Sequence, residues 1–322
     1  MTQMNYVKRI GLDTYRIQNR GGKGIKGMQT REEDVVTKLF LSSNHSYLLY
    51  FTDMGRVYRT KTYNIPEAGR TAKGTPVVNI IEKSPEEKIS EIIPVKEFSD
   101  NEYLVMVTKN GIIKKTPASE YESIRKSGKI AITLKEGDEL ISIFKTTGND
   151  NIFLATRNGM AICFNENDAR AVGRTASGVK AIDLADGDYV VGAEPVREDS
   201  KVLLVTDGGY GKCTDLTSFR IQHRGGKGLK AYKITEKTGN IIGISMVNDS
   251  EELIMVTSEG VVIRIRIKDI ATTTGRITQG VRLINLDDGV TVVSMDKISA
   301  EDAVEEESEE NNTEVTTETT EE

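Results

Sequence analysis

The chain has no tryptophan, and aromatic residues make up only 6% of its 322 residues. So few large side chains favour many small hydrophobic cores, one in each repeat, over one large core. No segment approaches the roughly 20 consecutive apolar residues of a membrane-spanning helix, and Lys8 and Arg9 interrupt the weakly apolar start. We therefore expect neither a transmembrane helix nor a signal peptide.

Cysteine and histidine are scarce, with two of each: Cys163, Cys213, His45 and His223. The cysteines lie 50 residues apart at equivalent positions of a repeat, so we expect separate, buried, free thiols in a reducing cytoplasm. The two histidines are far apart in sequence, no Cys/His metal spacing is present, and no Ser-His-Asp set can be assembled. The sequence predicts no catalytic residue and no metal site.

The charge is distributed unevenly along the chain. The formal net charge is −6, but residues 301–322 hold 11 acidic and no basic residues, which leaves 43 basic against 38 acidic residues in the rest. We expect this tail to be disordered, because almost nothing apolar is available to offset the entropy of ordering it. A basic body with an acidic tail suggests that the body binds a polyanion and that the tail competes for the same site.

What the sequence does contain is a repeated glycine-rich loop, which we call the box loop. Two copies are intact: Gln18-Asn19-Arg20-Gly21-Gly22-Lys23-Gly24 and Gln222-His223-Arg224-Gly225-Gly226-Lys227-Gly228. Weaker copies lie at 69–74, 173–178 and 275–280, and an eroded copy lies at 124–128. The last glycines of the six copies are 50 to 54 residues apart. A fixed period of this length indicates a repeat architecture.

A second motif, Thr-x-x-Gly between two strand-like runs, recurs in phase with the first. Its glycines are Gly55, Gly111, Gly159, Gly209 and Gly260. The dipeptides Asn110-Gly111 and Asn158-Gly159 suit the positive φ angles of tight hairpins. With further strands predicted after each box loop and before the next hairpin, each repeat holds about four strands. A helix-like pattern at 30–41 also suits a strand, and the repeat favours the strand.

Six such units predict an all-β, six-bladed, propeller-like ring, whose closure hides the exposed strand edges. The predicted blades span residues 1–45, 46–98, 99–148, 149–196, 197–247 and 248–300.

The box loop has the composition of a phosphate clamp. Its glycines allow positive φ and close approach, successive backbone N–H groups can form an anion-sized concavity, and its arginine and lysine add charge-assisted contacts. The alternative is a glycine turn with solvated charges. Five of the six copies keep Arg-x-x-x-Gly, and because a turn needs the glycine but not the arginine, this recurrence favours binding.

Two nucleotide-site patterns fail on context. The run Gly22-x-Gly24-x-x-Gly27 matches the dinucleotide fingerprint, but no helix begins there and no acidic residue follows at the required spacing. The segment 69–75 resembles a Walker loop only loosely, since its lysine precedes the second glycine. A nucleotide enzyme is therefore disfavoured.

Residues 15–25, Tyr-Arg-Ile-Gln-Asn-Arg-Gly-Gly-Lys-Gly-Ile, resemble the gyrase-A box, the signature of the C-terminal domain of the DNA gyrase A subunit. The Gly-Arg-Thr-Ala-x-Gly copies and the acidic tail match the same domain. The second intact box, at 222–229, is normally more degenerate in the family and suggests strong DNA binding by blade five.

The resemblance implies a β-pinwheel whose neighbouring blades exchange strands. It also implies that duplex DNA wraps around the rim without sequence preference, in a positive crossover that lets gyrase introduce negative supercoils. The breakage tyrosine and the ATPase belong to other parts of that enzyme, as do ATP and Mg²⁺, so the resemblance implies no cofactor and no turnover here. The implied partners are double-stranded DNA, the gyrase B subunit, and the N-terminal part of the gyrase A subunit, in the bacterial cytoplasm at the nucleoid. The isolated domain is expected to be a monomer.

We predict that DNA contacts the box loops together with cations that follow the hairpin turns. The predicted residues are Lys8, Arg9, Arg16, Gln18, Arg20, Gly21, Gly22, Lys23, Gly24, Arg56, Arg59, Arg70, Lys73, Lys114, Lys115, Arg125, Arg174, Lys212, Arg220, Gln222, Arg224, Gly225, Gly226, Lys227, Gly228, Arg264 and Arg276. Two alternatives remain: the C-terminal domain of the topoisomerase IV A subunit, in which the box is usually eroded, and a propeller-type protein–protein scaffold.

Overall fold

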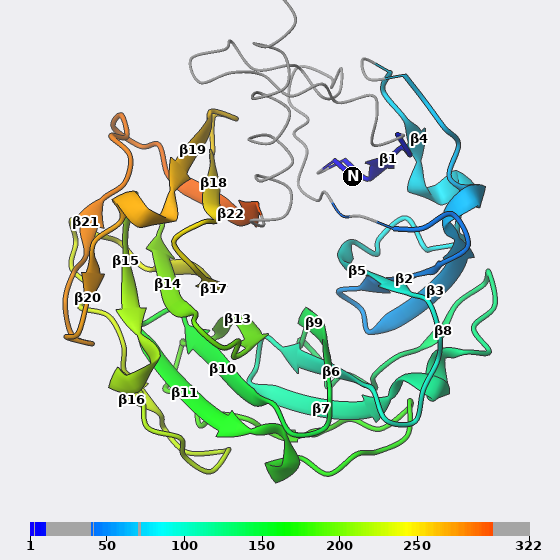
Figure 1. The fold of residues 1–322 in the computed structure, drawn as a ribbon, viewed down its shortest axis with the longest axis horizontal. Coiled ribbons are helices and arrows are strands. Elements are labelled where there is room, and N and C mark those ends of the chain that lie inside the picture. The colour runs from blue at the N-terminus through cyan, green and yellow to red at the C-terminus, as the bar shows by residue number, and fades with distance from the viewer. Residues whose placement is uncertain (3, 11–39, 41, 70–71, 299–322) are drawn as a thin grey trace, which may run out of the picture.

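The computed structural model describes residues 1–2, 4–10, 40, 42–69 and 72–298. In this part of the chain the regular elements are β-strands and short 3-10 helices, arranged as a β-propeller (Figure 1). The sheets follow one another around a ring, and the strands of each sheet succeed one another from the centre to the perimeter. The prediction of an all-β propeller is confirmed.

Five sheets of three to five strands form the blades, which we number two to six in chain order. From the centre outwards, blade two consists of β5 (Ile89–Val95), β2 (Tyr47–Thr52), β3 (Arg56–Lys61) and β8 (Lys129–Ile130). Blade three consists of β9 (Leu140–Thr146), β6 (Tyr103–Thr108), β7 (Ile112–Pro117) and β12 (Val179–Lys180). Blade four consists of β13 (Val190–Pro195), β10 (Asn151–Thr156), β11 (Met160–Asn165) and β16 (Leu229–Lys230).

Blade five consists of β17 (Ile241–Val247), β14 (Lys201–Thr206) and β15 (Tyr210–Asp215), with β20 (Thr272–Thr273) and β21 (Val281–Arg282) both paired to β15. Blade six consists of β22 (Val292–Ile298), β18 (Glu252–Thr257) and β19 (Val262–Arg266).

The number of blades differs from the prediction, because the described residues form five blades and not six. Beyond them lies only a two-stranded sheet of β1 (Tyr6–Val7) and β4 (Thr75–Pro76). Most of the predicted first blade, including the pattern at 30–41, falls outside the described residues, as does the tail at 301–322. Strands β1 and β4 pair in the same register as β3 and β8. Tyr6 lies opposite Pro76, and Arg56 lies opposite Ile130.

Neighbouring blades exchange their outer strands. Strand β8 follows the hairpin of blade three but pairs with β3 of blade two, and β16 follows the hairpin of blade five but pairs with β11 of blade four. The same step joins β12 to β7 and β21 to β15. Among the described residues, blades two to five are therefore each completed by the next sequence repeat, which links these blades covalently around the ring.

The Thr-x-x-Gly motif forms the hairpin turn. In all five copies the threonine hydroxyl accepts a hydrogen bond from the backbone N–H four residues later, at 3.1 to 3.3 Å. The glycine adopts positive φ, as at Gly111 (+77°) and Gly159 (+84°), whereas Asn110 and Asn158 are not among the positive-φ residues. Only the glycine of each Asn-Gly pair supplies the angle, so the prediction for the asparagines was wrong.

The hydrophobic cores lie between blades. Alternate residues of one strand face opposite neighbours: Leu49 and Phe51 of β2 pack with Leu104 of β6, whereas Leu48 and Tyr50 pack with Val7. Several small cores were predicted, and this is confirmed. They do not belong to single repeats, because a flat sheet has two faces and each must be covered.

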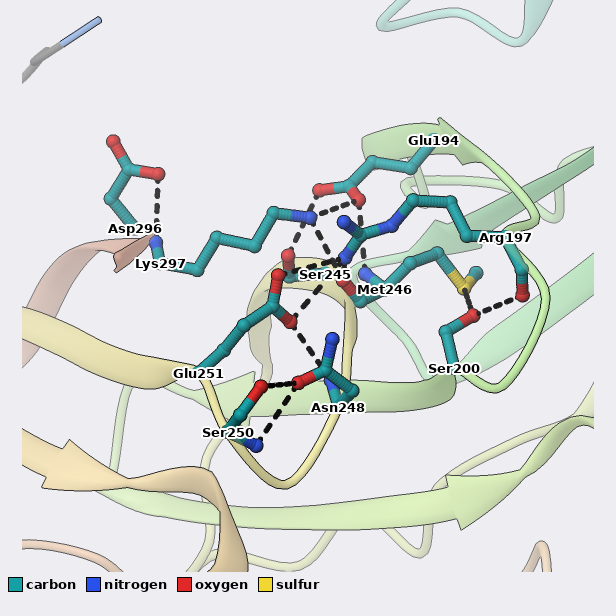
Figure 2. Close-up of polar contacts among 10 residues, drawn as sticks. All are labelled: Glu194, Arg197, Ser200, Ser245, Met246, Asn248, Ser250, Glu251, Asp296 and Lys297. Carbon is teal, nitrogen blue, oxygen red and sulfur yellow. Dashed lines mark hydrogen bonds and ion pairs between the residues drawn. The ribbon is translucent and has the colours of Figure 1, made fainter. Parts of the chain in front are cut away.

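A polar network joins the inner strands of blades four, five and six (Figure 2). Lys297 donates to Glu194 Oε2 (3.1 Å) and to the Met246 carbonyl (2.8 Å). Arg197 donates to the same carbonyl and pairs with Glu251 at 3.2 Å. Glu194 also accepts from Ser245 and from the Met246 N–H. One network thus ties β13, β17 and β22 together.

Two further sequence predictions can be compared with the structure. Cys163 and Cys213 are free and buried, as predicted, and burial raises the pKa of each thiol to about 11. Among the described residues, none of the helices is long and apolar enough to cross a membrane.

Candidate nucleic-acid interface

The box loops follow one another along the perimeter. The segment that follows one box loop hydrogen-bonds to the box loop of the next repeat. Thr133 N–H donates to the Ala176 carbonyl, Asp183 N–H to the Gly226 carbonyl, and Lys233 N–H to the Thr278 carbonyl. The outer strands that follow the loops, among them β8, β16 and β21, lie at the outside of the ring (Figure 1). These contacts form one continuous series, which we call the outer belt.

The last glycine of each described box loop has a structural function. Gly128, Gly178, Gly228 and Gly280 all adopt positive φ. A Cβ atom on Gly178 would lie 2.5 Å from the Ile113 carbonyl oxygen of the preceding blade, and Gly228 is packed as tightly against Ala161. Because the loop must approach this backbone to deliver its outer strand, the glycine is required by the fold whether or not DNA binds.

The box arginines are partly engaged in the belt. Arg224 Nη1 donates to the Lys180 carbonyl (2.9 Å) and its Nε to the Asp168 carbonyl (2.8 Å). Arg174 makes the equivalent contact with the Ile130 carbonyl. The Nη1 atom of Arg276 is buried and has no hydrogen-bond partner among the described residues. The inference that a turn does not need the arginine was therefore too strong, because the arginine also links successive loops.

Several predicted DNA contacts are buried. Lys114 and Lys212 are 1% and 0% exposed, and their ammonium groups donate to backbone carbonyls of the next box loop. Lys115 is 4% exposed and ion-paired with the fully buried Glu166 at 2.9 Å. These three lysines were predicted at the DNA surface, and this was wrong. Lys114 and Lys115 are adjacent and point to opposite faces of β7, and period and residue type did not reveal that both faces of this strand are covered.

Other predicted cations are tied to local partners. Arg9 donates to the Ile65 carbonyl and pairs with Glu67, Arg59 donates to the Glu122 carbonyl, and Arg264 pairs with Glu252. Arg56 donates to Tyr58 and to the Ser127 carbonyl, at the eroded box loop. Lys8 donates to the Gly69 and Ala72 carbonyls. Of these contacts, those of Arg56 and Lys8 reach box loops directly.

The belt also presents exposed cations. Of the predicted residues, Lys73, Arg125, Arg220 and Lys227 are exposed. The box loop at 222–228 also has the unsatisfied donors that an anion needs: no described residue accepts from the backbone N–H groups of Gly226, Lys227 and Gly228. Within the same loop His223 is 99% exposed, with Nδ1 3.3 Å from Asp168 Oδ2. Free backbone N–H groups beside an exposed lysine are the donors that a phosphate-binding loop requires.

Sequence reasoning missed a further set of exposed cations, three on the outer strands and two in the segments before them: Lys180, Lys230 and Arg282, and Lys126 and Arg170. Three of them, Lys180, Lys230 and Arg282, stand two residues after the last glycine of a box loop. This in-phase position was available in the sequence. Lys180 lies 2.8 Å from Asp183, and Arg282 donates to Tyr210, so Lys230 is the least engaged of the three.

Some predicted site residues lie outside the described residues: Arg16, Gln18, Arg20, Gly21, Gly22, Lys23, Gly24 and Arg70. In the described part of the chain, no group of three or more His, Cys, Asp or Glu residues is placed to hold a metal ion.

The fold and the belt define a class of protein: a strand-exchanged β-propeller whose perimeter carries recurring cationic glycine loops. The family described as "DNA gyrase C-terminal domain, beta-propeller" matches six segments of the chain, at residues 1–43, 46–96, 102–147, 150–197, 200–248 and 251–299. The chain belongs to this family.

Individual relatives agree with this assignment. The chain is 50% identical to the DNA gyrase A subunit of Clostridium acetobutylicum over 303 residues, which is 94% of this chain and 36% of that protein. The chain thus spans about a third of the length of the curated relatives that it matches.

Two solved structures share the fold. The C-terminal domain of DNA topoisomerase IV has a TM-score of 0.82 at 28% identity, with 97% of this chain and 96% of that chain covered. The DNA gyrase A C-terminal domain has a TM-score of 0.74 at 25% identity, with 93% and 98% covered. The backbone resembles both, and the 50% sequence identity to a gyrase relative decides between them.

Proposed function

We propose that this chain binds duplex DNA without sequence preference and wraps it around the perimeter of a closed six-bladed pinwheel. The observation that carries the proposal is the outer belt: box loops in one continuous series, with exposed cations and unsatisfied backbone N–H groups along it. The six segments matched by the family support the sixth blade. Phosphate contacts carry no sequence information, so binding through them has no sequence preference.

Energetics favour an arc of contacts over a single site. Bending 20 to 30 base pairs by 40–90° costs of order 1–6 kcal/mol, and a half-turn or more around a small disc costs about ten. One loop cannot offset this. Several loops, each releasing counterions as it neutralises phosphates, can do so.

In the whole enzyme this wrap gives a positive crossover, and strand passage by the rest of gyrase then leaves negative supercoils. We propose that the domain itself is non-catalytic and uses no cofactor. Its partners are double-stranded DNA, the gyrase B subunit, and the N-terminal part of the gyrase A subunit, in the bacterial cytoplasm at the nucleoid.

The test is the writhe of plasmid DNA relaxed and resealed on the protein. Wild-type protein is expected to leave resealed circles with positive writhe, and circles without it would show that wrapping is wrong. Arg20→Ala with Lys23→Ala is expected to abolish wrapping, and Arg224→Ala with Lys227→Ala to reduce it. As the matched control, Lys96→Ala and Lys145→Ala remove exposed lysines after and on inner strands, and wrapping should persist.

A protein–protein scaffold is the competing function. It is disfavoured by the low aromatic content, since protein interfaces are enriched in aromatic residues. Filter binding of plasmid across a salt series separates the two functions, because a scaffold should retain little plasmid at any salt concentration.

A further inference from the structure

Lysines that contact a box loop recur in alternate blades, and of these Lys114 and Lys212 are buried whereas Lys8 is half-buried. They occupy the third position of the outer hairpin strand at Lys8, Lys114 and Lys212, and each contacts the box loop of the next repeat. The intervening blades carry other side chains at the equivalent position, three residues after the glycine of the Thr-x-x-Gly motif: Tyr58, Ile162 and Ile263. The loops at 69–74, 173–178 and 275–280 thus have a cation beneath them, and the one at 222–228 does not.

The contacts fix the orientation of the loop backbone. Lys114 donates to the carbonyls of Arg174, Gly173 (3.4 Å) and Ala131. Lys212 donates to the carbonyls of Arg276 and Gly275 (3.4 Å) and to the Thr278 hydroxyl (3.2 Å). Both ammonium groups are enclosed under the loop. The loop carbonyls therefore point towards the interior of the protein.

This orientation directs the loop's donors outwards. In a trans peptide the C=O and the following N–H point in opposite directions. Carbonyls of residues 173 and 174 that face Lys114 therefore turn the N–H groups of Arg174 and Thr175 away from it. No described residue accepts from either, nor from the N–H groups of Arg276 and Ile277 in the loop above Lys212. Two adjacent outward N–H groups are an anion-binding arrangement.

We propose that Lys114 and Lys212 are positioning residues for phosphate binding by the loops at 173–178 and 275–280, and that each takes up a proton from the buffer when a DNA phosphate binds its loop. The inference rests on the proposed DNA-binding function and deepens it. These lysines do not touch DNA. They hold the loop open to it and place positive charge beneath it.

The charges around the two lysines support this coupling. Burial lowers the pKa of Lys114 to about 7, with the Arg174 guanidinium lowering it further and Glu120 raising it. Burial and Arg276 lower the pKa of Lys212 to about 8, and the Tyr232 ring centroid lies 5.2 Å from its Nζ. A phosphate on the loop offsets the arginine charge and adds a negative charge nearby, so it favours protonation of the lysine.

The sign of the pH dependence follows. A DNA-bound state that holds more protons loses affinity as the pH rises through about 7 to 8. Stability of the free protein changes in the opposite direction. An unfolded lysine keeps its ordinary pKa and binds more protons than the folded one above pH 7, so stability rises with pH.

The experiment measures DNA binding and proton uptake together, by calorimetry on the full chain in two buffers of different ionisation enthalpy. Wild-type protein is expected to take up protons between pH 7 and 8. Lys114→Met with Lys212→Met should abolish this uptake and weaken DNA binding at pH 7 by about tenfold or more. As the control, Lys126→Met removes an exposed belt cation and should weaken binding while uptake persists.

Each outcome of this experiment supports or contradicts the inference. Wild-type uptake and affinity in the double variant would overturn the inference. If the double variant does not fold, wild-type protein still tests it: DNA binding without proton uptake between pH 7 and 8 contradicts it. Absence of DNA binding by the wild-type protein at every pH is a different result, because it removes the proposed function itself.

Discussion

At the scale of the residue, burial decides whether a lysine supports the fold or is exposed to DNA. Lys114 and Lys115 are adjacent on β7, and both ammonium groups are enclosed, one beneath a box loop and one beside Glu166. Lys227 and Lys230 belong to the same repeat system but face the perimeter. Effects on stability should therefore dominate for Lys115, which pairs with Glu166, and direct effects on DNA binding for Lys227 and Lys230, whereas Lys114 acts on DNA binding only through the loop above it.

Removing Lys115 tests this separation. Glu166 is 0% exposed and also accepts from Thr146 and from the N–H groups of Gly148 and Asp150. Lys115→Met leaves its buried charge without a cation, and we expect about 3–5 kcal/mol lower free energy of unfolding, measured by urea titration. The double variant with Glu166→Gln should recover part of the loss. A loss below about 1 kcal/mol would show that the pair does not carry this stability.

The last box glycine allows a matched comparison. Gly228→Ala places a methyl group against the Ala161 carbonyl at φ +74°, whereas Gly187→Ala meets nothing within 4 Å at φ +76°. Both variants incur the cost of positive φ, about 1–3 kcal/mol, but only the first adds a clash. We expect the lower melting temperature for Gly228→Ala, and equal melting temperatures would contradict the close packing of loop and blade.

At the scale of the element, the inner strands differ in how they are joined. The network of Glu194, Arg197, Glu251 and Lys297 connects β13, β17 and β22. Between β9 and β13 the corresponding polar contact is a single hydrogen bond from Ala193 N–H to the Ser142 hydroxyl (3.1 Å). Blades four to six should therefore open together.

Cutting the network should loosen one side of the ring. Lys297→Met removes the donors to Glu194 and to the Met246 carbonyl, and we expect a loss of about 1–3 kcal/mol. Amide hydrogen exchange should accelerate in β17 and β22 and remain unchanged in β2 and β6. Lys145→Met, which removes an exposed lysine from another inner strand, serves as the control. Uniform acceleration in all blades would mean that the ring opens as a single unit.

At the scale of the whole molecule, the acidic tail is expected to compete with DNA for the belt. Residues 301–322 carry 11 acidic and no basic residues. Deleting the chain after residue 300 should tighten DNA binding or leave it unchanged, most clearly at low salt where screening is weak. Fluorescence anisotropy with a long duplex measures this. Weaker binding after deletion would refute autoinhibition by the tail.

The binding itself should be steeply salt-dependent. Each phosphate neutralised contributes about −0.9 to the slope of log Kobs against log salt concentration. A wrap held by several loops predicts a slope several times that of a single contact, and removing Lys227 and Lys230 should reduce it by about two. A slope near zero would exclude the belt as a DNA surface.

Much of this architecture was predictable because it is periodic. The hairpin of Tyr47–Thr52 and Arg56–Lys61 forms around its Thr-x-x-Gly motif as predicted, and the inner strands Val190–Pro195 and Ile241–Val247 lie before the next hairpin, as predicted. The strands that follow the box loops are shorter than a sequence pattern can show, since β8 pairs over only Lys129–Ile130 before the chain leaves the sheet and Ala131 N–H donates to the Gly55 carbonyl. The β-propensity of a segment does not show how many of its residues will find a partner strand.

Sequence alone determined the repeat, its period, the hairpin turns and the family resemblance, because these depend on residue type at fixed spacing. Tertiary structure alone decided which cations reach the perimeter. Lys114 and Lys212 lie beneath the neighbouring loop, and Arg174 and Arg224 donate to the outer strand that follows the preceding loop. Strand exchange brings segments of successive repeats into contact. The environment of each side chain is therefore set by the next repeat, which no pattern within its own repeat can show.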